Sequence, residues 1–357
     1  MLGRCVKSDM NTSACECGNE LFFDSMQCVA CGIDVGLCEA CHEITPIRKM
    51  EDDTTCCQHC ETPLIPCWNR ETHGVCNVWT VPGDESGLCE FCRLTTVIPD
   101  LTVAGNQLRW KALEAAKRRV IVGVELAGFP TSEAFAADDL PLTFEFKADG
   151  PAPVATGHAN GCITINIREA DPVEREKTRV KFGEPQRTLV GHFRHELGHY
   201  YWDLLVKSTP QLVEYRKLFG DETNPDYDTA RKRYYAEGPQ PDWQETFISA
   251  YASMHPWEDF AESFGALLDM IAVLETARHF GILNESDTPL PAEEDFESLL
   301  LDYQGLGVAV NELNREMGLL DLVPEVMNET AREKLRFVYE LGHSSASNAE
   351  EKAHLTA

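Results

Sequence analysis

The stretch TLVGHFRHELGHYYWDLLV at Thr188–Val206 contains the motif HELGH at positions 195–199. Apolar residues recur along one side of this stretch at helical spacing, which predicts an amphipathic helix. In such a helix His195 and His199 lie one turn apart on the same face, so both imidazoles can reach one metal ion. Glu196 lies about 100° further round the helix, beside the open coordination position of that ion.

This arrangement of residue types predicts a hydrolytic zinc site. A carboxylate at Glu196 can take a proton from zinc-bound water, whose pKa the metal lowers to about 7. The alternative is a chance match on a helix that carries these side chains only for solvation. A mostly buried helix argues against it, because an unpaired buried polar group costs roughly 2–7 kcal/mol. We therefore expect His195 and His199 to bind Zn²⁺ and Glu196 to act as general base.

A second acidic segment, at 242–270, offers the third ligand that a catalytic zinc requires. Glu258 and Glu262 are four residues apart and share one helix face. If Pro256 begins that helix, Glu258 lies in its first turn, where the helix dipole favours the ionised carboxylate. We expect Glu258 to bind the metal and Glu262 to orient a ligand histidine, and the exchange of these roles stays open. The weaker candidates for these two roles are His255 and Asp203.

The cysteines predict further metal sites. Of fifteen cysteines, fourteen lie between Cys5 and Cys92, many of them in short CxxC pairs. The predicted four-thiolate sets are Cys15, Cys17, Cys28 and Cys31; Cys38, Cys41, Cys57 and Cys60; and Cys67, Cys76, Cys89 and Cys92. Paired CxxC elements at this separation are typical of zinc ribbons. We expect two to three structural Zn²⁺ ions in addition to one catalytic ion.

The middle set leaves alternatives open, because Cys56 adjoins Cys57 and either His42 or His59 could replace a thiolate. The cysteines expected to be free are Cys5, Cys56 and Cys162. The N-terminus MLGRCVKSDM lacks the apolar segment of a signal peptide, and no run of eighteen apolar residues occurs. We therefore expect a cytoplasmic protein with no membrane association and with thiolates kept for zinc.

The 357 residues suggest two domains. We expect a zinc-ribbon region at 1–95, a catalytic domain at 100–343 and a flexible tail at 344–357. Strands are expected at Leu140–Lys147 and Cys162–Arg168, the second either an edge strand that aligns a peptide or an interior strand. The expected helices are Asn106–Ala127, Pro185–Val206, Gln211–Phe219, Asp226–Ala236, Asp242–Ser253, Pro256–Phe280, Phe296–Glu316 and Ala331–Leu341. Few strands followed by many helices predict an α+β class with a small sheet.

Several runs carry a family resemblance: CGNELFFDSMQCVACG at 17–32, GLCEFCRLTTVIPDL at 87–101, TGHANGCITINIREAD at 156–171, EPQRTLVGHFRHELGHYYWDLL at 184–205 and SAYASMHPWEDFAESF at 249–264. They resemble the bacterial zinc-binding metallopeptidases, which carry N-terminal zinc ribbons ahead of a gluzincin-type domain. The resemblance covers nearly the whole chain and implies the same ligands and base. The third-ligand region also resembles that of a distant gluzincin, in which a tyrosine seven residues ahead of the ligand assists the transition state. That position is Tyr251 here, and Tyr251 or His255 would stabilise the oxyanion.

Charge bears on the partners. The chain has 31 basic and 59 acidic residues, so its net charge of −28 opposes nucleic acid as a partner. Residues 1–95 alone carry a net charge of −9, and bound thiolates would add to it. We expect the substrate to be a peptide or protein, and the ribbons to recognise protein or serve as scaffold. The predicted function is zinc-dependent peptide-bond hydrolysis; the alternative is an inactive zinc-ribbon adaptor or regulatory protein that binds a protein partner.

Overall fold

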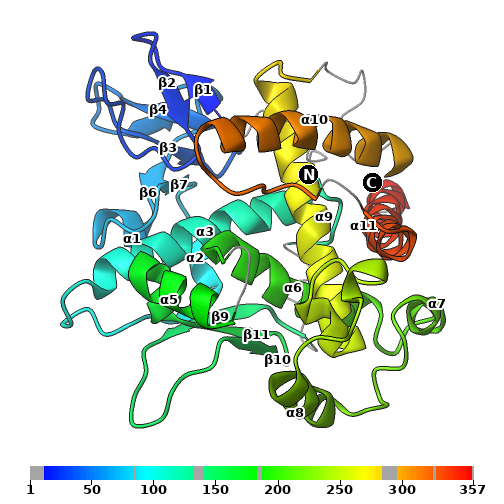
Figure 1. The fold of residues 1–357 in the computed structure, drawn as a ribbon. Coiled ribbons are helices and arrows are strands. Elements are labelled where there is room, and N and C mark those ends of the chain that lie inside the picture. Colours follow the sequence, from blue (N-terminus) through cyan, green and yellow to red (C-terminus); the bar gives the residue numbers. More distant parts are fainter. Residues whose placement is uncertain are drawn as a thin grey trace.

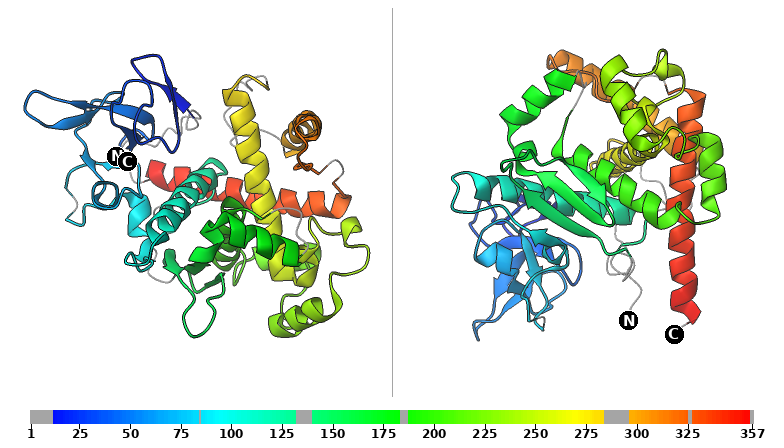
Figure 2. Two further views of the ribbon diagram at one scale, coloured as in Figure 1. Left: turned by 60° about the vertical axis from the view of Figure 1, so that its left-hand side comes forward. Right: turned by 90° about the horizontal axis from the view of Figure 1, so that it is seen from below.

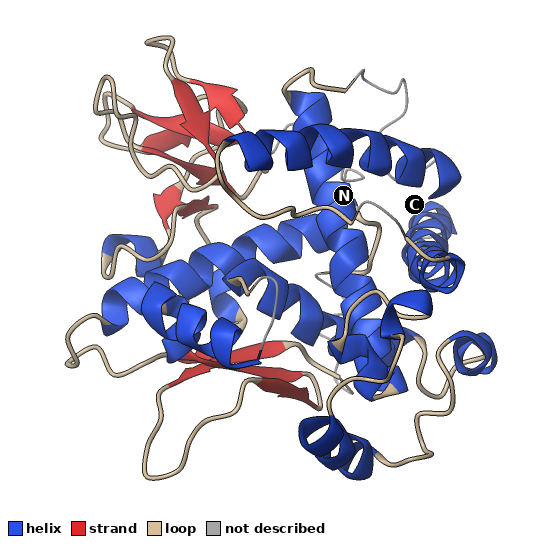
Figure 3. Ribbon diagram, viewed as in Figure 1, coloured by secondary structure: helices blue, strands red, loops and turns tan. Residues whose placement is uncertain are grey.

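The computed structural model describes residues 12–83, 85–131, 140–182, 187–283, 296–324 and 327–355. A cysteine-rich part of short strands adjoins a larger part built mainly from helices, which confirms the expected α+β class (Figure 1). The strands gather in two places, one in the cysteine-rich part and one beside the helices (Figure 3). Across these described ranges, no helix combines the length and the apolarity needed to cross a membrane.

The cysteine-rich part consists of short strands joined by tight turns. Strands β1 (Thr12–Ala14) and β2 (Glu20–Phe22) form an antiparallel pair. A five-stranded sheet follows in the order β5-β4-β3-β7-β6. Its strands are β3 (Val35–Cys38), β4 (Ile44–Lys49), β5 (Thr55–Cys57), β6 (Ile65–Pro66) and β7 (Val78–Thr80). Because β7 pairs with β3, the second and third cysteine sets share one sheet.

The second sheet has the order β10-β11-β9-β8. Its strands are β8 (Thr95–Val97), β9 (Thr143–Lys147), β10 (Gly157–Ala159) and β11 (Cys162–Asn166). Strand β11 lies between β10 and β9, so the interior alternative holds and an edge position for Cys162–Arg168 is wrong. The cause is the turn at Asn160-Gly161, where φ values of 49° and 79° fold β10 back onto β11.

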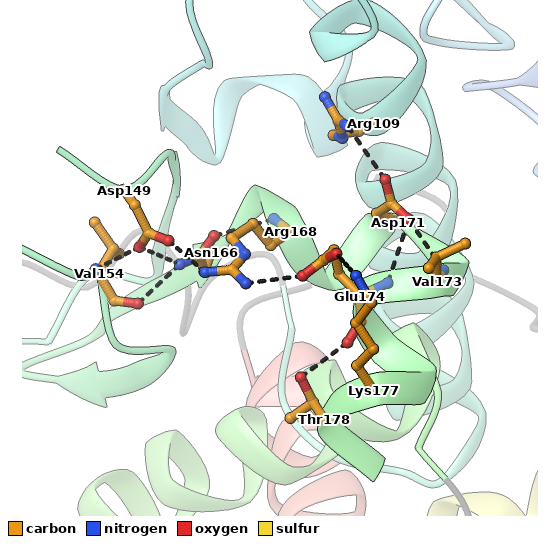
Figure 4. Close-up of polar contacts among 10 residues, drawn as sticks. All are labelled: Arg109, Asp149, Val154, Asn166, Arg168, Asp171, Val173, Glu174, Lys177 and Thr178. Atoms are coloured by element: carbon orange, nitrogen blue, oxygen red, sulfur yellow. Dashed lines mark hydrogen bonds and ion pairs between the residues drawn. The ribbon is translucent and has the colours of Figure 1, made fainter. Parts of the chain in front are cut away.

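A polar network joins this sheet to two neighbouring helices (Figure 4). Arg168 donates to Asp149 and to Glu174, each at 2.8 Å, and so bridges the loop after β9 and helix α5 (Pro172–Phe182). Asp171 accepts backbone N–H groups at the start of α5 and also a hydrogen bond from Arg109 at 3.2 Å. These are structural ion pairs that fix α5 against the sheet and against the helix that carries Arg109.

The helical part is arranged around α9 (Pro256–His279). The other long helices are α3 (Asn106–Leu126), α6 (Leu189–Leu205), α10 (Phe296–Glu316) and α11 (Glu329–Leu355). The shorter helices are α1 (Trp68–Glu71), α2 (Glu90–Arg93), α7 (Gln211–Leu218) and α8 (Tyr227–Glu237). The short 3₁₀ helices are η1 (Ile167–Ala170), η2 (Trp243–Glu245) and η3 (Tyr251–Met254). Helix α9 packs against α3, α6, α10 and α11, and Figure 2 shows α11 beside it from two further directions. One buried apolar core runs from the ribbons into these helices.

Three expected helices differ from the structure. Helix α6 begins at Leu189, where the Thr188 hydroxyl accepts the Gly191 N–H at 2.9 Å; Pro185 lies outside the described residues. The segment 242–253 forms η2 and η3 instead of a helix. Hydroxyl side chains compete for backbone groups there: Ser249 accepts from the Ala252 N–H.

The C-terminal helix is longer than expected. Helix α11 continues to Leu355 instead of ending at Leu341, so the tail expected at 344–357 begins as helix. The segment lacks apolar periodicity, but its alanine, glutamate and lysine residues are strong helix formers that propagate a helix already started.

Candidate metal centres

The two histidines of the motif direct their ring nitrogens to one place. The Nε2 atoms of His195 and His199 are 3.1 Å apart. Helix α6 holds them there because its opposite face is buried, with Phe193 and Leu197 fully inaccessible to solvent. Because side chains at i and i+4 are neighbours on one helix face, the local geometry follows directly from the motif.

Glu258 completes the group from a neighbouring helix. Pro256 begins α9, and the side chain of His255 accepts the Trp257 N–H to cap it. Glu258 therefore lies in the first turn, with Oε2 at 2.9 Å from Nε2 of His195 and 3.3 Å from Nε2 of His199. Burial raises its pKa, but the positive charges of His199 and His195 outweigh burial and hold the pKa well below its ordinary value.

These three donor atoms fit a tetrahedral Zn²⁺. Ligand bonds of about 2.0–2.1 Å place tetrahedral donors about 3.3 Å apart, which agrees with the three separations given above. Oε2 of Glu258 is buried, and among the described residues its close polar neighbours are these two imidazole nitrogens, which are themselves metal ligands of the preferred type. The residues present therefore fit the zinc that this donor set implies.

The far side of the His195 ring is held by a carboxylate. Glu262, one turn beyond Glu258 on α9, lies with Oε1 at 2.7 Å from Nδ1 of His195. The Ser249 hydroxyl donates to the other oxygen of Glu262 at 2.6 Å. The two carboxylates thus approach opposite nitrogens of one imidazole, Glu258 at Nε2 and Glu262 at Nδ1.

His199 is held in a different way. Its ring lies against Trp257, with a centroid distance of 3.7 Å and an angle of 32° between the planes. Its Nδ1 atom is buried and has no hydrogen-bond partner among the described residues. Trp257 directly precedes Glu258 in the sequence, and this position was a usable signal for a residue that contacts a metal ligand.

Tyr227, at the start of α8, reaches the same group. Its hydroxyl donates to Oε1 of Glu258 at 2.7 Å. No local pattern indicates this contact, because Tyr227 precedes Glu258 by 31 residues and lies in a polar, mostly exposed helix. Only the tertiary fold brings the two side chains together.

Glu196 lies on α6 among these groups and is largely buried, at 7% exposure. Its Oε2 atom has no hydrogen-bond partner among the described residues. Burial raises the pKa of Glu196, while the neighbouring His195 and His199 act to lower it. The net upward shift brings this carboxyl group closer to the range in which a general base operates.

The remaining candidates differ in their positions. The Tyr251 ring lies beside His195, at a centroid distance of 5.8 Å, and burial raises the pKa of its hydroxyl well above the ordinary value. Both ring nitrogens of His255 are engaged, Nδ1 by the Trp257 N–H and Nε2 at 3.1 Å from the Glu222 carbonyl. Asp203 contacts Lys207 one turn on and is not among the converging donors. The structure therefore gives neither weaker candidate a place in the group.

The twelve predicted thiolate ligands form three groups of four. Sγ–Sγ distances within the groups include 3.6–3.8 Å pairs. Tetrahedral Zn–S bonds of about 2.3 Å place sulfur atoms about 3.8 Å apart, whereas a disulfide would require about 2.0 Å. These groups fit structural Zn²⁺, and the protein is a zinc protein.

The middle group contains Cys57 rather than Cys56. Cys56 is free and lies with its sulfur 3.6 Å from that of Met50; Cys162 is also free, and Cys5 falls outside the described residues. Neither His42 nor His59 belongs to the group.

The third group is the most deeply buried, and Cys67, Cys76, Cys89 and Cys92 are each at most 1% exposed. Helix α3 lies beside it with Lys117 and Arg118, which are also buried. Burial lowers the pKa of Arg118, but the negative charges of Cys76 and Glu114 outweigh burial. The pKa of the guanidinium group therefore lies above its ordinary value. Buried cations of this kind compensate the negative charge of a four-thiolate centre.

Comparison with known proteins gives two matching families. The family described as "Putative zinc-binding metallo-peptidase" matches residues 106–341, and a family of zinc-ribbon domains matches residues 12–103. Proteins of Mycobacterium bovis and Mycobacterium tuberculosis, described as uncharacterized, are 35% identical over 329 residues, which cover 90% of this chain and 92% of theirs. No solved structure matches the chain.

Proposed function

The chain belongs to the family described as "Putative zinc-binding metallo-peptidase", and from this membership we propose that it hydrolyses peptide bonds with Zn²⁺ as the catalytic metal. The observation that supports the proposal most is the convergence of three donor atoms, from His195, His199 and Glu258, next to the buried carboxyl group of Glu196. A structural zinc site closes with four protein donors, whereas three leave a position for water or substrate.

We assign the metal to Nε2 of His195, Nε2 of His199 and Oε2 of Glu258. When bound, Zn²⁺ supplies Lewis-acid chemistry, since it acidifies water at its open position and polarises a carbonyl group. Glu262 accepts the Nδ1 proton of His195, which leaves the Nε2 lone pair directed at the metal position.

Glu196 is the proposed general base. Its carboxylate takes a proton from the attacking water and then delivers that proton to the amine that leaves. Burial raises the pKa of Glu196, which makes its carboxylate a stronger base for the first of these steps.

Tyr251 is the proposed donor to the developing oxyanion. Its raised pKa keeps the hydroxyl protonated at neutral pH, and its ring lies beside His195. His255 is less suited to this role, because its two nitrogens already bind backbone groups.

A peptide or protein is the proposed substrate. Strand β10 (Gly157–Ala159) forms the outer edge of its sheet and packs against α6, so an extended chain paired with it would pass close to the metal ligands. The strongly negative charge of the molecule argues against nucleic acid as a partner. The first ribbon exposes Cys17 and Cys31, and we propose that the ribbons contact a protein partner or serve as scaffold.

The test is the variant Glu196→Gln, which keeps the shape of the side chain and removes the base. We expect peptide hydrolysis to fall by about 10²- to 10⁴-fold while native mass spectrometry still counts four zinc ions. The matched control is Glu214→Gln, an exposed glutamate on α7 whose loss should leave hydrolysis unchanged.

A Glu196→Gln protein with wild-type hydrolysis would refute the base assignment. A wild-type protein that holds four zinc ions and cleaves no member of a peptide library would refute peptide hydrolysis and favour the inactive adaptor.

A further inference from the structure

Glu258 uses its two oxygens for different purposes. Oε2 faces the two imidazole Nε2 atoms, whereas Oε1 receives the hydroxyl hydrogen of Tyr227 at 2.7 Å. A carboxylate with both oxygens free can bind a cation through either or both of them. The phenol uses one lone pair of Oε1 and stabilises the orientation in which Oε2 faces the imidazoles, so two-oxygen binding would require the carboxylate to turn against this hydrogen bond.

Tyr227 is held in this orientation by rings at the start of α9. Its ring packs edge-on against Trp257 at 5.5 Å and against His255 at 5.4 Å. The Trp257 ring in turn lies on His199. Tyr227 is therefore aimed at Glu258 by the same residues that border the metal ligands.

The chemistry of the contact suits a lasting donor. A phenol is protonated at neutral pH and can donate its hydrogen, whereas an ionised carboxylate can only accept, so the direction of this hydrogen bond is fixed. Asp226 caps α8 by accepting the Thr229 N–H at 3.1 Å, which fixes the first turn from which Tyr227 projects. Elsewhere α8 is largely exposed, with Ala230 as its buried residue.

We propose that Tyr227 is a positioning residue that restricts Glu258 to one-oxygen coordination of the catalytic Zn²⁺. The inference rests on the proposed zinc ligands, and it deepens that assignment by naming what fixes the third ligand. One-oxygen binding matters because it keeps a coordination position open for water, as catalysis requires.

The test is Tyr227→Phe, which removes the hydroxyl and keeps the ring. Zinc affinity is measured by competition with a chromophoric chelator, and native mass spectrometry counts the ions that remain. We expect one zinc ion to bind about 10- to 100-fold more weakly, as is typical when an outer partner of a metal ligand is lost. The three ribbon ions provide an internal reference and should be retained.

Two further variants identify the origin of the effect. Tyr235→Phe, at an exposed position on the same helix, should leave zinc affinity unchanged. In a Glu258→Gln background, Tyr227→Phe should weaken zinc binding no further, because its effect acts through that carboxylate.

Unchanged zinc affinity in Tyr227→Phe would overturn the proposal. So would an equal loss at all four ions, which would mean general destabilisation, or a loss that persists in the Glu258→Gln background. A lower kcat at saturating zinc with unchanged affinity would assign the hydroxyl to the substrate instead. The zinc-affinity measurements need no hydrolysis, so they test the role of Tyr227 even if peptide cleavage is never observed.

Discussion

At the scale of single residues, the two ligand histidines are oriented by unlike forces. His195 has a carboxylate at 2.7 Å from Nδ1, and that carboxylate is itself fixed by Ser249. His199 has no such partner at Nδ1 among the described residues, and a Trp257 ring covers its face instead. Hydrogen bonding fixes both the ring plane and the tautomer of an imidazole, whereas stacking fixes the plane alone.

Trp257→Leu should therefore weaken zinc binding through His199. We expect an affinity loss of about 10-fold, at the lower end for an outer partner of a metal ligand, since the ring regains rotational freedom. Chelator competition measures the affinity, and thermal unfolding of the zinc-free protein measures the packing loss separately. If Trp257 only fills space, stability will fall and zinc affinity will stay at the wild-type value.

The local motif made part of the site predictable from the sequence. His195, Glu196 and His199 lie within one helical turn, so the helical period alone brings them together. The roles of Glu258 and Glu262 could be predicted only by assuming that Pro256 begins a helix. Their spacing alone did not decide which of the two binds the metal. Tyr227 joins the site only through tertiary contacts with no sequence signal.

At the scale of elements, the site depends on how closely α6 and α9 approach. Gly198, within the HELGH motif, faces Ala261 of α9, and a Cβ atom at Gly198 would lie 2.7 Å from the Cα atom of Ala261. A glycine inside a helix costs about 0.5–1 kcal/mol relative to alanine. Here the missing side chain allows the backbones to meet, which brings Glu258 to the two histidines.

Gly198→Ala tests this close approach. We expect overpacking to reduce the free energy of unfolding by about 1–3 kcal/mol and to weaken binding of the catalytic zinc, because α9 must move away. The measurements are denaturant unfolding and chelator competition. The control is Gly123→Ala in α3, where an added Cβ meets no atom within 4 Å, so stability should rise slightly. If Gly198→Ala changes neither the free energy of unfolding nor the zinc affinity, the contact between the two helices tolerates a methyl group.

The helices were easier to predict than the segments between them. Periodic apolar residues located α3, α9 and α10 to within a residue or two at each end. The helix expected at 242–253 does not form, because serine hydroxyls in this segment bind the backbone and replace helical hydrogen bonds. The dipeptide Asn160-Gly161, with both φ values positive, is a typical hairpin signal that places β10 next to β11.

At the scale of the whole molecule, the third thiolate group is continuous with the part that matches the metallopeptidase family. Cys92 is followed directly by β8 (Thr95–Val97), which pairs with β9 in the sheet beside the metal helices. Lys117, buried on α3, forms an ion pair with Glu114 at 2.8 Å and also donates to Thr95 on that strand. We therefore expect removal of a zinc ion here to disturb the peptidase-like part itself.

Cys89→Ser and Cys31→Ser should therefore differ, although each removes one thiolate and one structural zinc. Cys89 is fully buried in the third group, whereas Cys31 is exposed in the first. Structural zinc contributes folding free energy directly, so Cys89→Ser should lower the thermal midpoint of the helical part and weaken the catalytic zinc as well. Cys31→Ser should leave the thermal midpoint of the helical part and the affinity of the catalytic zinc site close to the wild-type values.

Far-ultraviolet circular dichroism follows the helices during heating, and native mass spectrometry counts the ions. If both variants lower the thermal midpoint of the helices equally, the ribbons act as one unit. If Cys89→Ser does not lower it, the third group does not stabilise the helical part. A selective loss would place the physical boundary between the two parts before Cys67, because the buried cations of α3 and the strand after Cys92 belong to one packed unit.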